Sequence, residues 1–189
     1  PIWHCPDDDI FWIGTHGDPV TFNTKTGAVE YPACANEHFI YTQHVLSPLG
    51  KDSAGRIWLS MMSNYNLDPG HPLGIMVYDD SLYTFFDSTD MLLPTGKITA
   101  FFADSDGNVW IGAEFAAVSR FDGSQWKTFS VFDSATKPNY ISSLGTDSLG
   151  RLWCSIREKG FAIMKDSVWS LYNGPSFPEA SLMHITTMA

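Results

Sequence analysis

The feature that most constrains the fold of this chain is a short motif that occurs three times. It reads Asp-Ser-x-Gly-x-(Ile/Val/Leu)-Trp and occupies residues 52–58, 104–110 and 147–153. A degenerate fourth copy, Asp-Asp-Asp-Ile-Phe-Trp, precedes them at residues 7–12. The four Trp residues are separated by 46, 52 and 43 residues, the span of one four-stranded blade of a β-propeller. The spacing therefore predicts an all-β section of a propeller.

A second set of aromatic residues repeats with the same period. In the last two copies a Trp stands 16 residues after the motif Trp, and another ring follows three residues later (Trp126 with Phe129, and Trp169 with Tyr172). In the second copy the ring pair comes 25 residues after the motif Trp, because nine residues are inserted between Leu59 and Gly74. The motif Trp residues and the ring pairs thus repeat with the same period, which indicates one structural unit repeated four times.

Each part of the motif has a physical reason. Asp-Ser-x-Gly predicts a tight hairpin turn in which the carboxylate accepts backbone N–H bonds and Gly takes a positive φ. The residues that follow, such as Val109, Trp110 and Ile111, are apolar at consecutive positions. Neighbouring side chains of a strand point to opposite faces, so this strand should be buried on both. Cys154 replaces an apolar residue here, which predicts a small core side chain.

We expect blades at about 1–43, 44–96, 97–139 and 140–179, and the first strand of a further blade at 180–189. Within the last two complete blades the predicted strands are 98–103, 108–112, 116–121 and 125–129, then 140–146, 151–155, 161–165 and 168–172. Four blades and one strand predict that a longer chain or another copy supplies further blades. Open blade faces would then favour self-association.

Composition excludes several classes of partner. The net charge is −10, which repels phosphate backbones, so nucleic acid is not an expected partner. No apolar run reaches the roughly 18–20 residues that span a bilayer, so this segment should make no membrane contact. Cys5, Cys34 and Cys154 lack metal-type spacing; free thiols are expected, with a Cys5–Cys34 disulfide as the alternative.

We predict no metal site and no cofactor. The six His residues are scattered without a His-x-x-x-His pattern. Asp104, Asp106 and Asn108 alternate in a way that suggests calcium, but the other copies have Ala54 or Leu149 in place of Asp106. A structural turn therefore explains these residues better.

The segment 98–113, Ile-Thr-Ala-Phe-Phe-Ala-Asp-Ser-Asp-Gly-Asn-Val-Trp-Ile-Gly-Ala, resembles the two-component-regulator propeller repeat. Residues 120–129 extend the resemblance, which covers nearly the whole chain and is weakest in the first blade. It implies the periplasmic sensor region of a bacterial hybrid histidine kinase or a related secreted propeller, often responsive to glycans. The expected location is therefore periplasmic or extracellular.

The topology of such a blade separates two ends. The tight turns lie at one end, and the long connections, 32–43, 62–73, 87–97, 130–139 and 173–181, lie at the other. Binding residues concentrate in variable loops on a rigid scaffold. The predicted ligand-binding residues at this end are His16, Asp18, Asn64, Tyr65, Asp68, His71, Glu114, Arg157 and Glu158. The inserted loop 62–72 combines a ring, amides and a carboxylate, which suits sugar or peptide recognition, although a solvated surface loop has the same composition. Arg157 suits a carboxylate ligand, but a salt bridge to Glu158 or a neighbouring blade is the favoured interpretation.

Three functions follow from these residues. The first is a non-catalytic sensor that binds a small extracellular ligand such as a glycan. The second is a structural or interaction module without a pocket. The third is a metal-dependent lyase similar to the streptogramin lyases, whose His base and metal ligands have no matching positions here. Since motifs for nucleophilic catalysis are missing as well, we expect no enzyme activity.

Overall fold

The computed structural model describes residues 2–5, 8–15, 19–32, 44–63, 73–80, 82–94, 97–115, 117–131, 140–157 and 159–172. Every element of regular secondary structure in these ranges is a β-strand. None of the described residues forms an apolar helix of membrane-spanning length.

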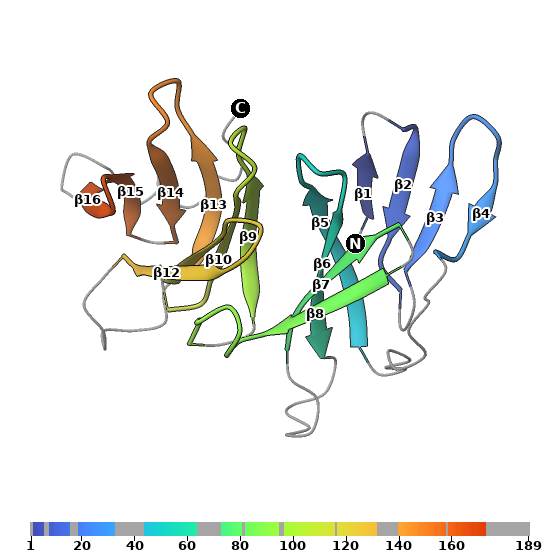
Figure 1. Cartoon of the computed structure of the whole chain (residues 1–189), viewed down its shortest axis with the longest axis horizontal. Helices are drawn as coiled ribbons and strands as arrows, with labels where there is room; N and C mark the ends of the chain where they lie inside the picture. The colour runs from blue at the N-terminus through green and yellow to red at the C-terminus, as the bar shows by residue number, and fades with distance from the viewer. Residues whose placement is uncertain are drawn as a thin grey trace. The chain divides into compact units, whose positions relative to one another are not determined.

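The strands form four antiparallel sheets, each made of four strands in chain order (Figure 1). We call these sheets blades 1 to 4. Blade 1 contains β1 (Ile2–Cys5), β2 (Ile10–Ile13), β3 (Val20–Asn23) and β4 (Val29–Glu30). Blade 2 contains β5 (His44–Lys51), β6 (Ile57–Ser63), β7 (Gly74–Asp79) and β8 (Leu82–Asp87). Blade 3 contains β9 (Ile98–Ala103), β10 (Val109–Ala113), β11 (Ala117–Phe121) and β12 (Trp126–Ser130). Blade 4 contains β13 (Ile141–Thr146), β14 (Leu152–Ile156), β15 (Gly160–Lys165) and β16 (Val168–Tyr172).

The predicted all-β class is confirmed, and the strands of blades 3 and 4 begin and end within about one residue of the expected positions. Strand β10 is buried at all five of its residues, as the run of consecutive apolar side chains predicted. The expected strand at 180–189 lies outside the described residues.

The chain divides into two compact units, residues 1–87 and 88–189. In the first unit, blades 1 and 2 share a core that includes Trp12, Leu59, Met76 and Tyr83. Trp12 contacts Tyr78 of blade 2, with ring centroids 5.4 Å apart. The motif Trp of blade 1 therefore packs against the blade that follows it.

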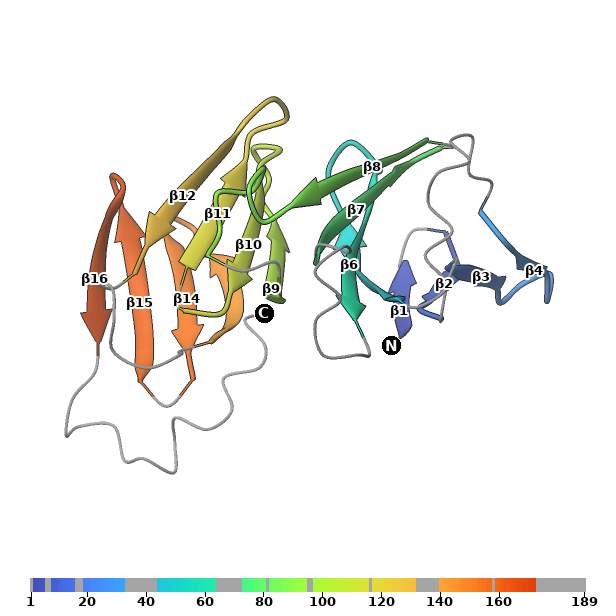
Figure 2. The same cartoon turned by 90° about the horizontal axis from the view of Figure 1, so that it is seen from below.

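The second unit repeats this arrangement. Trp110, Val118 and Phe129 of blade 3 share a core with Leu152 and Cys154 of blade 4. Figure 2 shows the strands of these two blades arranged as two successive sheets. Alternation along the strands places Trp110 and its cross-strand neighbours Arg120 and Lys127 on the face of blade 3 that contacts blade 4.

Gly112 is the point of closest approach between these two blades. A Cβ atom at this position would lie 2.5 Å from Cγ2 of Ile141, and Ile141 is fully buried. Since no side chain fits there, glycine lets β10 approach β13.

Candidate functional site

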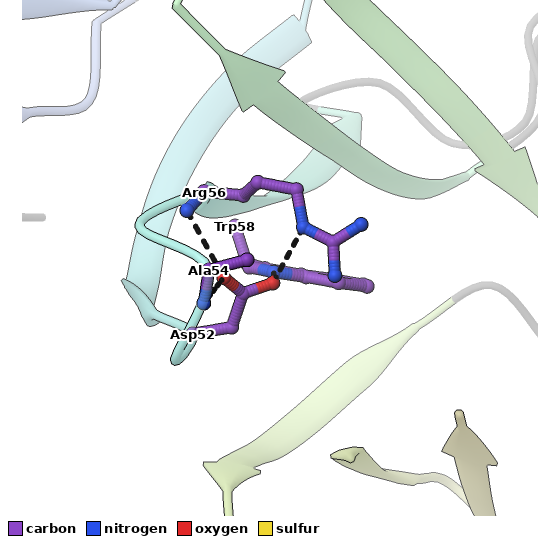
Figure 3. Close-up of polar contacts among 4 residues, drawn as sticks. All are labelled: Asp52, Ala54, Arg56 and Trp58. Atoms are coloured by element: carbon purple, nitrogen blue, oxygen red, sulfur yellow. Dashed lines mark hydrogen bonds and ion pairs between the residues drawn. The ribbon is translucent and has the colours of Figure 1, made fainter. Parts of the chain in front are cut away.

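The repeated turn is organised around its Asp carboxylate (Figure 3). Asp52 Oδ1 accepts hydrogen bonds from the backbone N–H groups of Ala54 and Arg56, each at 3.0 Å. Asp52 Oδ2 accepts bonds from Arg56 Nε and from the indole Nε1 of Trp58, both at 2.8 Å. Gly55 completes the turn with a φ of 87°. The predicted hairpin turn is therefore present, with the carboxylate at its centre.

The bond from the motif Trp to the motif Asp recurs in three blades. Trp110 Nε1 donates to Asp104 at 2.8 Å, and Trp153 Nε1 donates to Asp147 at 2.8 Å. Sequence reasoning found the Asp and the Trp separately and missed this bond. The constant spacing of six residues was the available signal, because a hairpin turn of fixed length brings the indole back to the carboxylate. These Asp residues therefore stabilise the turn and connect it to the motif Trp.

A guanidinium group lies over the motif Trp in each of blades 2, 3 and 4, but its source changes. Arg56 and Arg151 belong to the turns of blades 2 and 4, and each lies 5.8 Å from the centroid of its Trp ring. In blade 3 the turn has Asn108 instead, and the guanidinium comes from Arg120 on β11, 5.7 Å from the ring of Trp110. The position of the cation is kept although the residue that supplies it is not.

Two of the predicted ligand-binding residues lie together at the loop end of the second unit, around Tyr140. Glu114 follows β10 and pairs with Tyr140 in an isolated β-bridge. Arg157 follows β14; its backbone N–H donates to the Tyr140 carbonyl at 2.9 Å, and its guanidinium lies 5.9 Å from the ring centroid. The structure thus brings Glu114 and Arg157 to the same tyrosine.

Lys97 joins this group, although no sequence motif singles it out. Its ammonium forms an ion pair with Glu114 at 2.7 Å and lies 5.4 Å from the centroid of the Tyr140 ring. The hydrogen bond to Glu114 raises the pKa of Lys97, so the ammonium stays charged at neutral pH. We call Lys97, Glu114, Tyr140 and Arg157 the loop-end cluster. It presents two cations and one carboxylate beside an aromatic ring.

The other predicted residues, His16, Asp18, Asn64, Tyr65, Asp68, His71 and Glu158, lie outside the described residues and remain predictions. Cys34 lies outside them as well. Cys5 and Cys154 are buried thiols that form no disulfide. Burial raises the pKa of the Cys154 thiol to about 12, which agrees with a core role for this residue. Among the described residues, no three His, Cys, Asp or Glu side chains gather as metal ligands.

A groove of about 830 Å³ lies between blades 3 and 4 at the opposite, turn end of the second unit. It is lined by residues of the turns between β9 and β10 and between β13 and β14, and by the turn between β15 and β16. Trp110, Arg120 and Phe129 supply part of its wall. Sequence reasoning placed binding at the loop end and missed this groove. The signal for it was Arg120, a charged residue where the other blades have a neutral one.

The fold and these sites define a β-propeller section. Residues 92–115 match the family described as Two component regulator propeller. This segment contains the turn, β10 and the motif Trp of blade 3, so blade 3 carries a repeat of that type and the resemblance inferred from the sequence is confirmed. No curated protein sequence matches the chain significantly.

Solved propellers resemble the chain over most of its length. Two structures of the extracellular domain of BT4673 from B. thetaiotaomicron, described as a one-component and a hybrid two-component system, have TM-scores of 0.59 and 0.58 at 16% and 15% identity. Each match covers 89% of this chain and 21% of that domain. The chain thus spans about a fifth of their length.

A second kind of propeller is similarly close in fold. Regucalcin from Agrobacterium tumefaciens, described as a calcium-binding protein, has a TM-score of 0.60 at 12% identity, over 88% of this chain and 56% of that one. A luciferin-regenerating enzyme has a TM-score of 0.58 at 13% identity, over 90% and 59%. At these sequence identities the similarity establishes the propeller fold alone, so the function has to be inferred from the residues of the candidate sites.

Proposed function

We propose that the chain is a non-catalytic ligand-binding module in the extracytoplasmic part of a bacterial two-component-type signalling protein. The loop-end cluster is the observation that carries the binding role. Lys97 and Arg157 lie beside one ring, and Glu114 holds the first of them in place. Two further observations support the signalling role. One is the regulator-type repeat of blade 3, and the other is the similarity in fold to extracellular domains described as parts of such systems.

The chemistry of this cluster suits a small, hydroxyl-rich ligand such as a glycan. Guanidinium and ammonium groups donate several hydrogen bonds, a carboxylate accepts them, and an aromatic ring packs against an apolar sugar face. The Lys97 side chain is half exposed and Arg157 is exposed, so both can be reached from solvent.

A calorimetric screen of neutral and acidic oligosaccharides against the chain tests this proposal. We expect Arg157→Ala to weaken binding of any ligand found by about tenfold, because a hydrogen bond to a charged group is lost. Lys25→Ala is the matched control, since Lys25 pairs with Asp9 at an exposed turn of the first unit. Equal affinity in wild type and Arg157→Ala would contradict a site at the loop end.

A second candidate function is an interaction module, because blade 4 has an aromatic face that no described residue covers fully. Trp153, Phe161 and Tyr172 are stacked along this face, with successive centroids 5.4 Å and 4.9 Å apart, and Tyr172 is 45% exposed. A metal-dependent lyase is the third candidate, and chelator-sensitive turnover would be its mark. We propose that the module has no enzyme activity and lies in the periplasm or outside the cell, which fractionation of the producing bacterium would test.

A further inference from the structure

Blade 3 departs from the other blades at one position on its third strand. The residue directly across from the motif Trp is Thr21 in blade 1, Val77 in blade 2 and Ile163 in blade 4. In blade 3 it is Arg120. A charged side chain therefore stands where the repeat otherwise places an uncharged, β-branched one. Such an exchange at a packed interface costs free energy unless the charge is paired and hydrogen-bonded.

The charge of Arg120 is not neutralised by the described part of the chain. In blades 2 and 4 the guanidinium over the Trp is bound by the turn carboxylate, at 2.8 Å and 2.6 Å from Nε. In blade 3 that carboxylate, Asp104, accepts instead from Asn108 and Trp110. Arg120 Nε is buried without a hydrogen-bond partner among the described residues. None of the ion pairs between described residues involves Arg120.

Arg120 lies in the wall of the groove between blades 3 and 4. The rest of the lining is rich in neutral hydroxyl groups, from Ser105, Thr146, Ser148 and Ser167. A volume of about 830 Å³ lies within the range of small-molecule sites. The groove therefore offers the Arg120 guanidinium, together with Lys165 at the turn between β15 and β16, among groups that hydrogen-bond to hydroxyls.

A second buried donor without a partner belongs to the same interface. Trp169 Nε1 has no hydrogen-bond acceptor among the described residues, and Trp169 packs against the core shared by the two blades. Its cross-strand neighbour, Met164, lines the groove. Both unsatisfied groups are N–H donors, so the complementary group is an acceptor.

We propose that this groove binds a small hydroxylated molecule through a carboxylate held by the Arg120 guanidinium. The planar fork of arginine matches a carboxylate in a bidentate geometry. Four carboxylates line the groove as well. Those of Asp104 and Asp147 accept hydrogen bonds from Trp110 and Trp153. Those of Asp106 and Asp166 would repel a polyanion, so a single carboxylate fits better than a polyphosphate. The inference goes beyond the proposed function, because this site lies at the turn end of the unit and the loop-end cluster lies at the other.

The test compares a uronic acid with its neutral analogue. Sodium glucuronate and glucose are titrated into the full chain and followed by calorimetry or by NMR shifts. We expect glucuronate to bind at least about tenfold more tightly than glucose, because only the carboxylate engages Arg120. Absence of glucuronate binding, or equal affinity for both sugars, would overturn the proposal.

Arg120→Val is the decisive variant, because Val is the residue that blade 2 has at this position. It should fold with a melting temperature equal to or above that of wild type and lose the preference for glucuronate. Arg120→Lys keeps the charge without the fork and should weaken binding several-fold. Arg56→Gln is the matched control, since its guanidinium lies over a Trp outside the groove; glucuronate binding should be unchanged.

These variants separate the possible results. If Arg120→Val fails to fold, Arg120 is a structural residue and the proposal is wrong; if it folds and still prefers glucuronate, the site is elsewhere. Arg157→Ala should leave glucuronate binding intact. Loss of binding in that variant instead would move the carboxylate site to the loop end.

Discussion

At the scale of single residues, the bond between the motif Asp and the motif Trp joins the turn of a blade to its second strand. Asp52 is 5% exposed and Trp58 is fully buried, so neither polar group can turn to water. A buried indole N–H that loses its acceptor costs free energy, and so does a guanidinium that loses its carboxylate. The turn and the strand are therefore coupled through one carboxylate.

Replacing that carboxylate should destabilise the first unit. We expect Asp52→Ala to lower the free energy of unfolding by about 2–3 kcal/mol, because it leaves Trp58 Nε1 unsatisfied and Arg56 unpaired. Urea denaturation followed by Trp fluorescence measures the change. Asp106→Ala, at an exposed turn position, should change stability by less than about 0.5 kcal/mol. A similar loss in both variants would mean that the bond is not the cause.

Carboxylates in the turns also predict how stability depends on pH. The Gln125 N–H, followed by the Ser124 hydroxyl and N–H, lowers the pKa of Asp122 to about 2. The Trp153 indole, together with the Arg151 groups, lowers the pKa of Asp147. Both folded-state pKa values lie below the unfolded value, so the unfolded chain binds more protons in acid.

This contribution to stability is complete above about pH 4 and is lost as the pH falls toward about 2. Denaturation at a series of pH values should show stability decreasing across this window. Asp122→Asn should make the free energy of unfolding depend less on pH across this window. The control variant Asp106→Asn should change this dependence less than Asp122→Asn does. A slope that Asp122→Asn does not change would assign the acid sensitivity to other groups.

Cys154 offers a chemical test of core packing. Burial raises the pKa of its thiol to about 12, so very little thiolate exists at neutral pH. We expect iodoacetamide to leave Cys154 unmodified in the native chain and to label it fully in denaturant, as read by peptide mass mapping. Fast native labelling would mean that blade 4 opens readily.

At the scale of the strand, much of blades 3 and 4 could be predicted from the sequence. Consecutive apolar residues and a turn of fixed length leave one arrangement for strands such as β10, which explains the agreement of their bounds. Glu114 and Arg157 could be selected because the topology places them in loops. Lys97 and Arg120 could not, since their roles depend on contacts across strands and between blades that no local pattern encodes.

Gly112 is a strand position that is sensitive to added volume. Gly112→Ala should cost about 1–3 kcal/mol, because the new Cβ atom would overlap Ile141. Ile141→Ala should also destabilise the unit, by about 2–4 kcal/mol, through the cavity that it leaves. The double variant should lose less than the two single losses combined, since the methyl group then has space. Strict additivity would mean that β10 and β13 do not meet at this point.

At the scale of the whole molecule, blades 1 and 4 each have a face that the described residues cover only in part. The face of blade 4 that carries Trp153 corresponds to the face of blade 3 that carries Trp110. In blade 3, blade 4 packs against that face. Phe11 and Ile13 of blade 1 correspond by register to Leu152 and Cys154, yet they are only partly buried. We therefore propose that blade 4 of one copy packs against blade 1 of another, as consecutive blades pack within a unit.

We expect the chain to associate head to tail as its concentration rises, as measured by light scattering. Phe161→Ser alters one partner of every such contact and Phe11→Ser alters the other, so each variant alone should be monomeric. A mixture of the two should form dimers and stop there, because one intact contact remains. Leu149→Ser, at an exposed turn, should associate like wild type. A mixture that stays monomeric would refute head-to-tail pairing.

The change in the source of the guanidinium in blade 3 also has a use in protein engineering. The cation over the motif Trp can come from the turn or from the third strand. A pair of substitutions such as Arg151→Asn with Ile163→Arg should therefore move its source from the turn to the third strand and keep a guanidinium over the Trp. The Asp and Trp that hold the turn are untouched by the exchange. A guanidinium of the kind proposed to bind a carboxylate in blade 3 can thus be placed in another blade by two substitutions, while the Asp–Trp turn stays the same.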